Sequence, residues 1–151
     1  MPSKVINITP EQVPMLSDGC KEFYATGAIP GELNLESWIN HWQYAIEAGH
    51  GFVWAVVDED SGEALAALGG YIGTDQSNAL DLVFTERFFF SRHASRGVGL
   101  KLIQQAERDM LDHGVDRIYM IHLANHEPEK AAKLYTYLGY APSEVLWVKE
   151  V

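Results

Sequence analysis

A basic, glycine-containing stretch lies in the middle of an otherwise acidic chain. Residues 87–106 hold four basic residues and no Asp or Glu, whereas the whole chain has a formal net charge of -10. The four are Arg87, Arg92, Arg96 and Lys101. Gly97 and Gly99 stand where a strand-like run gives way to a helix-like pattern. The free N–H groups of a helix start attract anions, and glycine lets the backbone approach them. The stretch therefore predicts a phosphate or pyrophosphate site; the alternative is an ordinary helix start behind a flexible turn.

The common nucleotide-binding patterns do not fit this stretch. The dinucleotide pattern G-x-G-x-x-G requires a third glycine, and Leu102 stands there instead. The sequence also contains no G-x-x-x-x-G-K-[ST] loop of the kind that binds nucleoside triphosphates. A nicotinamide dinucleotide or a nucleoside triphosphate is therefore not the predicted ligand.

Three side chains near this stretch are candidates for proton transfer. Asp81 and Glu86 lie in the strand-like run 78–90, where a regular strand places them on opposite faces. We favour Glu86 as a general base because it is nearer the glycines; the alternative is a solvated charge paired with Arg87. His122, in the strand-like run 115–123, is a second candidate base, with a hydrogen-bonded structural histidine as its alternative.

Metal chemistry and a cysteine nucleophile are not predicted. His122 and His126 are four residues apart, but a strand followed by a loop does not bring both rings to one face. Cys20 recurs with Val13, Leu16 and Phe23 at helical spacing, so it is expected in the core.

Composition and length point to one globular domain over residues 1–151. The chain is 47% hydrophobic, its first ten residues contain no apolar stretch of signal-peptide length, and nowhere does it approach the roughly 20 apolar residues of a membrane span. Together with the single cysteine this predicts a cytoplasmic protein without a membrane partner. The acidic balance argues against nucleic acid and favours small cations.

The periodicity predicts a mixed α/β (α+β) fold. The expected order is a strand at 4–9, helices at 9–24 and 34–49, a hairpin at 51–73, a strand at 78–90, a helix from Val98, a strand at 115–123, a helix at 129–138 and a closing strand at 143–151. A further short strand at Tyr140 would bring the strands to seven. The strand, helix and strand of the second half require a right-handed crossover and thus one parallel pair.

The run "SRGVGLKLIQQAE", followed about thirty residues later by "KLYTYLGY", resembles the GNAT family of N-acetyltransferases. Gly97 and Gly99 match the glycines of the family's R/Q-x-x-G-x-G/A signature, while Ala94 stands where Arg or Gln is usual. The predicted element order also matches, so the resemblance covers nearly the whole chain. It implies a mixed, mostly antiparallel sheet of six to seven strands with about four helices.

The resemblance further implies that acetyl-CoA is the cosubstrate, and it implies which residues bind acetyl-CoA. These are Phe89, Phe90, Arg92, Ser95, Arg96, Gly97, Val98, Gly99, Leu100 and Asn125. Tyr135 matches the tyrosine that in this family often protonates the departing thiolate; the alternative is that it packs on the sheet.

Two functions follow from these expectations. The first is direct acetyl transfer to a primary amine of a small cationic molecule or a protein, with Glu86 as base. Acidic residues of the first helices, Glu32, Glu36 and Glu47, would attract the ammonium group. The alternative is a catalytically inactive module of the same fold that binds partners through its acidic surface. The closing strand, "VLWVKEV", is either a sheet edge or a homodimer contact.

Overall fold

The computed structural model describes residues 2–92, 97–124 and 127–151 of the chain. Its contacts divide the protein into two compact units, Met1–Ile121 and His122–Val151, which are treated separately below. The first unit contains β1 (Ser3–Asn7), the 3-10 helix η1 (Pro10–Leu16), α1 (Ser17–Tyr24), α2 (Leu35–Glu47), β2 (Gly51–Asp58), β3 (Ala64–Asp75), β4 (Asn78–Ser91), α3 (Val98–Asp112) and β5 (Arg117–Tyr119).

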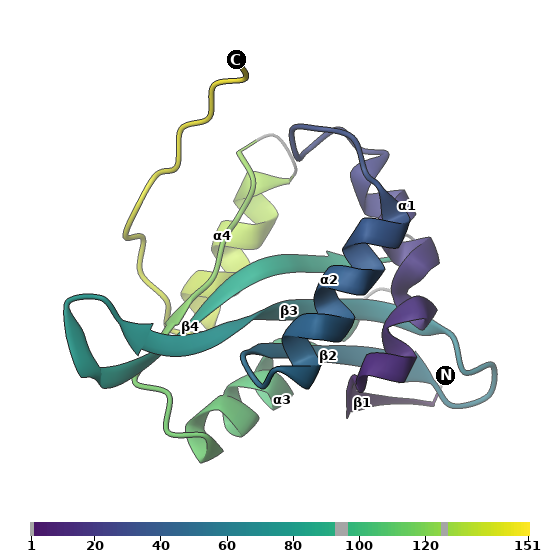
Figure 1. The fold of residues 1–151 in the computed structure, drawn as a ribbon, viewed down its shortest axis with the longest axis horizontal. Coiled ribbons are helices and arrows are strands. Elements are labelled where there is room, and N and C mark those ends of the chain that lie inside the picture. Colours follow the sequence, from purple (N-terminus) through teal and green to yellow (C-terminus); the bar gives the residue numbers. More distant parts are fainter. Residues whose placement is uncertain (1, 93–96, 125–126) are drawn as a thin grey trace. The chain divides into compact units, whose positions relative to one another are not determined.

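The first unit is built on one twisted sheet in the order β1-β2-β3-β4-β5 (Figure 1). Neighbours from β1 to β4 are antiparallel, while β5 runs parallel to β4. The crossover through α3 supplies this parallel pair, because a parallel neighbour cannot be reached by a tight turn. The predicted mixed, mostly antiparallel sheet is confirmed.

Local sequence signals set the ends of the first helices. The backbone N–H of Thr9 donates to Gln12 Oε1 at 2.9 Å, as expected for a helix that opens with Pro10. The Asn34 side chain accepts from Ser37 N–H at 3.0 Å and caps α2. Both starts lie where the sequence predicted them.

Aromatic side chains fix a helical layer on each face of the sheet (Figure 1). On one face, Trp42 of α2 stacks on Tyr71 with ring centroids 5.2 Å apart and meets Phe88 at 5.0 Å. On the other, Trp54 packs against Phe84, and its indole N–H donates to Asp109 of α3 at 2.8 Å. The helices η1, α1 and α2 thus cover one face and α3 covers the other.

The second unit contains α4 (Pro128–Tyr137), within a residue of the predicted helix. Gly139, with φ of +92°, follows the helix in a left-handed conformation that favours glycine. No helix among the described residues is long and apolar enough to cross a membrane.

The predicted strands at the end of the chain are wrong. The fifth strand is limited to Arg117–Tyr119, and neither Tyr140 nor residues 143–151 form a strand. β5 pairs with β4 only opposite Val83–Thr85, because β4 changes course at the next residues. The apolar pattern of 143–151 has no partner strand, and β-propensity without pairing does not make a strand. The sheet therefore has five strands in the described residues, not six or seven.

Candidate active site

A β-bulge interrupts β4 beside the predicted base. Gly70 of β3 pairs with Glu86 and Gly69 pairs with Phe88, so Arg87 has no opposite residue. The two strands approach closely here, since a Cβ added at Gly70 would lie 2.2 Å from the Thr85 carbonyl oxygen. Gly69 and Gly70, two adjacent glycines inside a strand, thus mark both a bulge and a close backbone approach.

Glu86 is the buried carboxyl group at this bulge. It is 4% exposed and is the one charged residue among the buried residues that the structure describes. Burial raises its pKa to about 8, while a backbone hydrogen bond from Ile121 and the charge of Arg87 act in the opposite direction. The Ile121 contact lies just beyond the last β4–β5 pair, so Glu86 stands where these two strands part. Such a carboxyl group exchanges its proton near neutral pH, as a general base must.

The other candidate bases have different surroundings. Asp81 accepts from Arg117 Nη1 at 3.1 Å, and the same guanidinium contacts Asp75 at 2.8 Å. This ion-pair group ties β5 to the hairpin of β3 and β4, which gives Asp81 a structural task. The ladder is regular only from Leu82 to Glu86, and the register shifts just before Leu82, so the predicted opposite faces of Asp81 and Glu86 stay a prediction. His122 is exposed and belongs to the second unit.

The start of α3 has the features of an anion site. Gly97 precedes the helix with φ of +79°, a conformation that L side chains rarely adopt. Among the described residues no side chain caps the helix start, and its first turn has no acidic residue. Phe89 of β4 packs below Gly99, where an added Cβ would lie 3.3 Å from the ring. The N–H groups of Val98, Gly99 and Leu100 thus lie at the positive end of a fifteen-residue helix, without a cap from any side chain that the structure describes.

The three phenylalanines of β4 point to different layers. Phe88 packs between Trp38 and Trp42 of α2, at 5.1 and 5.0 Å. Phe90 is buried and stacks on Phe23 of α1 at 6.1 Å. Phe89 is half-buried on the side of α3. The structure therefore gives Phe88 and Phe90 core contacts and leaves Phe89 nearest the helix start.

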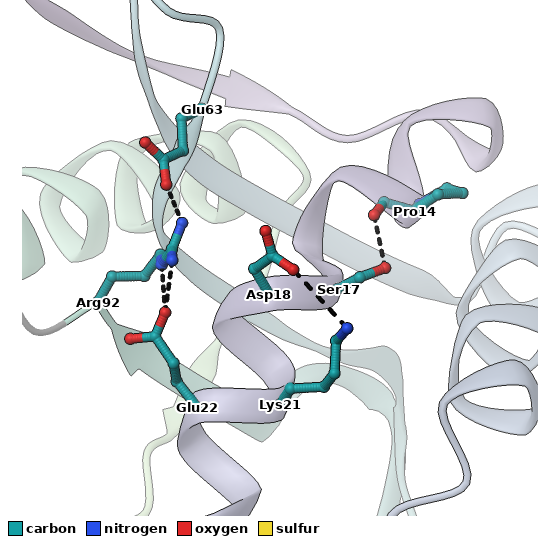
Figure 2. Close-up of polar contacts among 7 residues, drawn as sticks. All are labelled: Pro14, Ser17, Asp18, Lys21, Glu22, Glu63 and Arg92. Carbon is teal, nitrogen blue, oxygen red and sulfur yellow. Dashed lines mark hydrogen bonds and ion pairs between the residues drawn. The ribbon is translucent and has the colours of Figure 1, made fainter.

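Arg92 is held by two carboxylates, as Figure 2 shows. Its Nε and Nη2 atoms contact Glu22 Oε2 of α1, both at 2.6 Å, and its Nη1 contacts Glu63 just before β3. The neighbouring Lys21 pairs with Asp18 at 3.8 Å and does not join this group. Arg92 can therefore make its predicted contact with a cofactor phosphate only if its guanidinium releases one of these carboxylates or binds the phosphate in addition to them. Lys101 also has a partner, the Ser3 carbonyl oxygen at 2.5 Å.

Several predicted residues are not brought into this arrangement. Ser95, Arg96 and Asn125, together with Ala94 of the signature, lie outside the described residues. Tyr135 belongs to the second unit, where it is 8% exposed and its ring lies 5.6 Å from that of Tyr140. Its predicted role as an acid stays a prediction, and its burial agrees with a packing role as well.

Sequence reasoning missed two features beside the bulge. Tyr71 of β3 stacks on Trp42, and its hydroxyl is hydrogen-bonded to His41 Nε2 of α2. Arg87 was considered as one of the four basic residues of the stretch 87–106 and as a partner for Glu86, but its place as the inserted residue of the bulge was not foreseen. The sequence signal for this region is the run Gly69-Gly70-Tyr71, since paired glycines in a strand mark a bulge or a close approach of the backbone.

A hollow of about 350 Å³ lies elsewhere, between β1 and the end of α3. It is lined by Val5, Asn7, Gln105, Asp109, Asp112 and His113. Because these residues lie at the opposite end of α3 from Gly97, the hollow contains none of the predicted site residues. Among the residues that the structure describes, no group of three metal-ligating side chains occurs.

The site thus combines a buried carboxyl group at a strand bulge with a glycine-led helix start, on a mixed sheet with a parallel β4–β5 pair. Both features lie at the end of β4 or directly after it in the chain. The model of the acetyltransferase (GNAT) family matches residues 17–140. The chain belongs to the GNAT acetyltransferase family.

Solved structures show the same fold at low sequence identity. A ribosomal-protein-alanine N-acetyltransferase from Brucella melitensis biovar Abortus 2308 is 11% identical with a TM-score of 0.76, and the match covers 100% of both chains. An aminoglycoside acetyltransferase from an uncultured soil metagenomic sample is 15% identical, with a TM-score of 0.73 and coverage of 100% and 99%. Glucosamine-6-phosphate N-acetyltransferase from Arabidopsis thaliana is 12% identical, with a TM-score of 0.75 and 99% of each chain covered. No curated protein sequence matches the chain.

Proposed function

We propose that this protein is an acetyl-CoA-dependent N-acetyltransferase that acetylates a primary amine directly. The observation that carries the proposal is Glu86, a buried carboxyl group whose pKa is raised to about 8 beside the β4 bulge. An amine is protonated at neutral pH and must lose a proton before it can attack a thioester. The Glu86 carboxylate accepts that proton, the amine nitrogen bonds to the acetyl carbon, and the carbon–sulfur bond breaks.

The start of α3 is the proposed binding place for the pyrophosphate of acetyl-CoA. The N–H groups of Val98, Gly99 and Leu100 supply donors, and the helix dipole favours negative charge. Gly97 and Gly99 keep the approach open because neither carries a side chain. Ser95, Arg96 and Asn125 stay in the proposed set from the family resemblance alone.

Direct transfer is supported by the state of the cysteine. Cys20 is buried on α1, and burial raises its pKa to about 11. A thiol in this state is a poor nucleophile, because the thiolate is the reactive form. The departing coenzyme A thiolate requires a proton, and Tyr135 is the proposed donor from its place in the family motif.

Calorimetric titration with acetyl-CoA tests the proposal, with NAD and ATP as competing ligands. We expect selective binding of acetyl-CoA by the wild type, and a loss of roughly 100-fold or more in Gly99→Glu, because a carboxylate would occupy the pyrophosphate position. Gln104→Glu makes the same charge change at an exposed site further along α3 and should bind normally.

Coenzyme A release with a panel of primary amines then tests transfer. Absence of acetyl-CoA binding at millimolar concentration, or unchanged binding by Gly99→Glu, would overturn the proposed cosubstrate site. Tight binding without transfer to any amine would favour the inactive binding module instead.

A further inference from the structure

Arg87 is the inserted residue of the β4 bulge. It follows Glu86 directly and has no opposite residue on β3. Its side chain is exposed, whereas Glu86 and Phe88 on either side are buried. Bulges re-aim a side chain next to active sites, and here the re-aimed side chain is a guanidinium.

The guanidinium of Arg87 has no hydrogen bond or ion pair within the part of the chain that the structure describes. The other described arginines are engaged: Arg92 contacts Glu22 and Glu63, Arg117 contacts Asp75 and Asp81, and Arg108 donates to Gln105. In a chain with 21 acidic residues against 11 basic ones, an arginine left without an acidic partner is unusual. Its five donors are available to a ligand.

The surroundings of Arg87 place its charge beside the proposed base. Its charge acts on Glu86 and on Tyr24, at the end of α1. Glu86 meets the acceptor amine in the proposed reaction, whereas the coenzyme A phosphates belong to the helix start ten or more residues further along the chain. A charge beside the proposed base is therefore near the group that the acceptor must approach.

We propose that Arg87 binds an anionic group of the acceptor, a carboxylate or a phosphate carried within a few bonds of the reactive amine. This inference rests on the proposed function and names the substrate class for it. The pair formed by Glu86 and Arg87 offers a carboxylate to the ammonium group and a cation to the anionic group. A planar guanidinium binds either oxyanion through two parallel hydrogen bonds. The acceptor is thus an amino acid or an amino sugar phosphate, and a polycation is disfavoured.

Matched acceptor pairs test this inference. The pairs are free amino acids against their carboxamides, and glucosamine 6-phosphate against glucosamine. In the wild type we expect kcat/KM for the anionic member of at least one pair to exceed that of its neutral partner by roughly tenfold or more. The two kinds of pair distinguish a carboxylate from a phosphate.

Variants of Arg87 assign the preference to its guanidinium. Arg87→Gln should remove the preference by lowering kcat/KM for the anionic acceptor, with KM for acetyl-CoA unchanged. Arg87→Lys should restore part of it, because the charge remains while the two-pronged geometry is lost. Arg108→Gln, a loss of the same charge on α3, should keep the wild-type preference.

A purely electrostatic effect of Arg87 on Glu86 has a different signature. It would move the pH dependence for neutral and anionic acceptors equally and leave their ratio unchanged, which would overturn the inference. Equal use of both members of every pair by the wild type would also overturn it.

Failure of the proposed function itself is recognised separately, by an absence of transfer to any acceptor. In that case, titration of the wild type and Arg87→Gln with N-acetylglycine and its amide still tests the anion site. Weaker binding of the acid alone in the variant supports the inference, and equal binding refutes it. Circular dichroism of each variant establishes that it is folded.

Discussion

At the scale of single residues, the chemistry depends on how one carboxyl group is surrounded. Glu86 is nearly inaccessible to water, and its pKa of about 8 means that the protonated form predominates at neutral pH. A base in this state gains its active form as the pH rises through the pKa. Asp81, on the same strand, is instead paired with Arg117 and offers a matched comparison.

Replacing Glu86, the proposed base, should lower the rate of transfer and remove its pH dependence. We expect Glu86→Gln to lower kcat/KM for the amine by roughly 10²- to 10⁴-fold, because an amide cannot accept the proton. The wild-type kcat/KM should rise through an apparent pKa near 8, and this limb should be absent in the variant. Steady-state rates of coenzyme A release from pH 6 to about 9.5 measure both effects. A wild-type profile that persists in Glu86→Gln would assign the base elsewhere, and Asp81→Asn should keep the wild-type limb.

The same carboxyl group should make stability depend on pH. Its folded-state pKa lies above the usual value of 4.5, so the folded protein binds this proton more tightly than the unfolded chain does. Its contribution is complete below pH 4.5 and is lost as the pH rises to about 8. As the pH rises between these limits, the free energy of unfolding of the wild type should fall relative to that of Glu86→Gln, by on the order of a few kcal/mol. Urea unfolding of both proteins measures this difference. A difference that does not change with pH would mean that Glu86 has an ordinary pKa.

The sequence singled out Glu86 as a candidate but did not describe its surroundings. Its distance from the glycines along the chain favoured it over Asp81. Burial, the Ile121 contact and the exposure of Arg87 depend on the pairing register of β3 and β4. No local pattern in β4 reports that register, which is why the place of Arg87 in the bulge was not foreseen.

At the scale of elements, the close approach of β3 and β4 holds the bulge in place. Gly70 lies against Thr85, and an added Cβ would also come within 2.6 Å of the Phe84 ring. Gly73 lies further along β3, and an added Cβ there would meet nothing within 4 Å. The two glycines thus form a matched pair in one strand.

Adding one methyl group should therefore change the stability of the protein differently at these two glycines. We expect Gly70→Ala to destabilise the protein by roughly 2–4 kcal/mol, because the Thr85 backbone cannot yield without disturbing the ladder. Gly73→Ala should be neutral or slightly stabilising. Thermal and urea unfolding of both variants provide the comparison. If Gly70→Ala were as stable as Gly73→Ala, the strands would not approach as closely as described.

The elements that the sequence located correctly are those with local determinants. The cap at Asn34, the turn at Gly49 with φ of +87° and the end of α4 at Gly139 are each set by neighbouring residues. The strands at 115–123 and 143–151 were predicted from composition alone. Whether such a segment forms a strand depends on a partner distant in sequence, and the bulge removes that partner beyond Thr85.

At the scale of the whole molecule, the unpaired closing segment is the largest departure from expectation. Val145, Leu146, Trp147 and Val148 are 79, 90, 88 and 69% exposed. Monomeric proteins rarely expose contiguous apolar groups of this size, and such a surface marks an interaction site. The run is rich in valine, includes a tryptophan and contains few charges. It therefore has the composition of a strand, although no strand pairs with it among the described residues.

We therefore expect the closing segment to promote self-association. Burial of an apolar side chain contributes about 1.5–3 kcal/mol, so two copies gain substantially when these segments meet. Sedimentation velocity should show concentration-dependent association of the wild type, and the Leu146→Ser, Trp147→Ser double variant should remain monomeric at the same concentrations. Leu111→Ser, which removes an exposed leucine from α3, should associate as the wild type does. A wild type that stays monomeric, or a double variant that associates equally, would show that the homodimer contact lies outside this segment or does not form. Because Glu86 and Arg87 belong to the first unit, kcat/KM per chain should be the same in the double variant if association only protects the apolar segment.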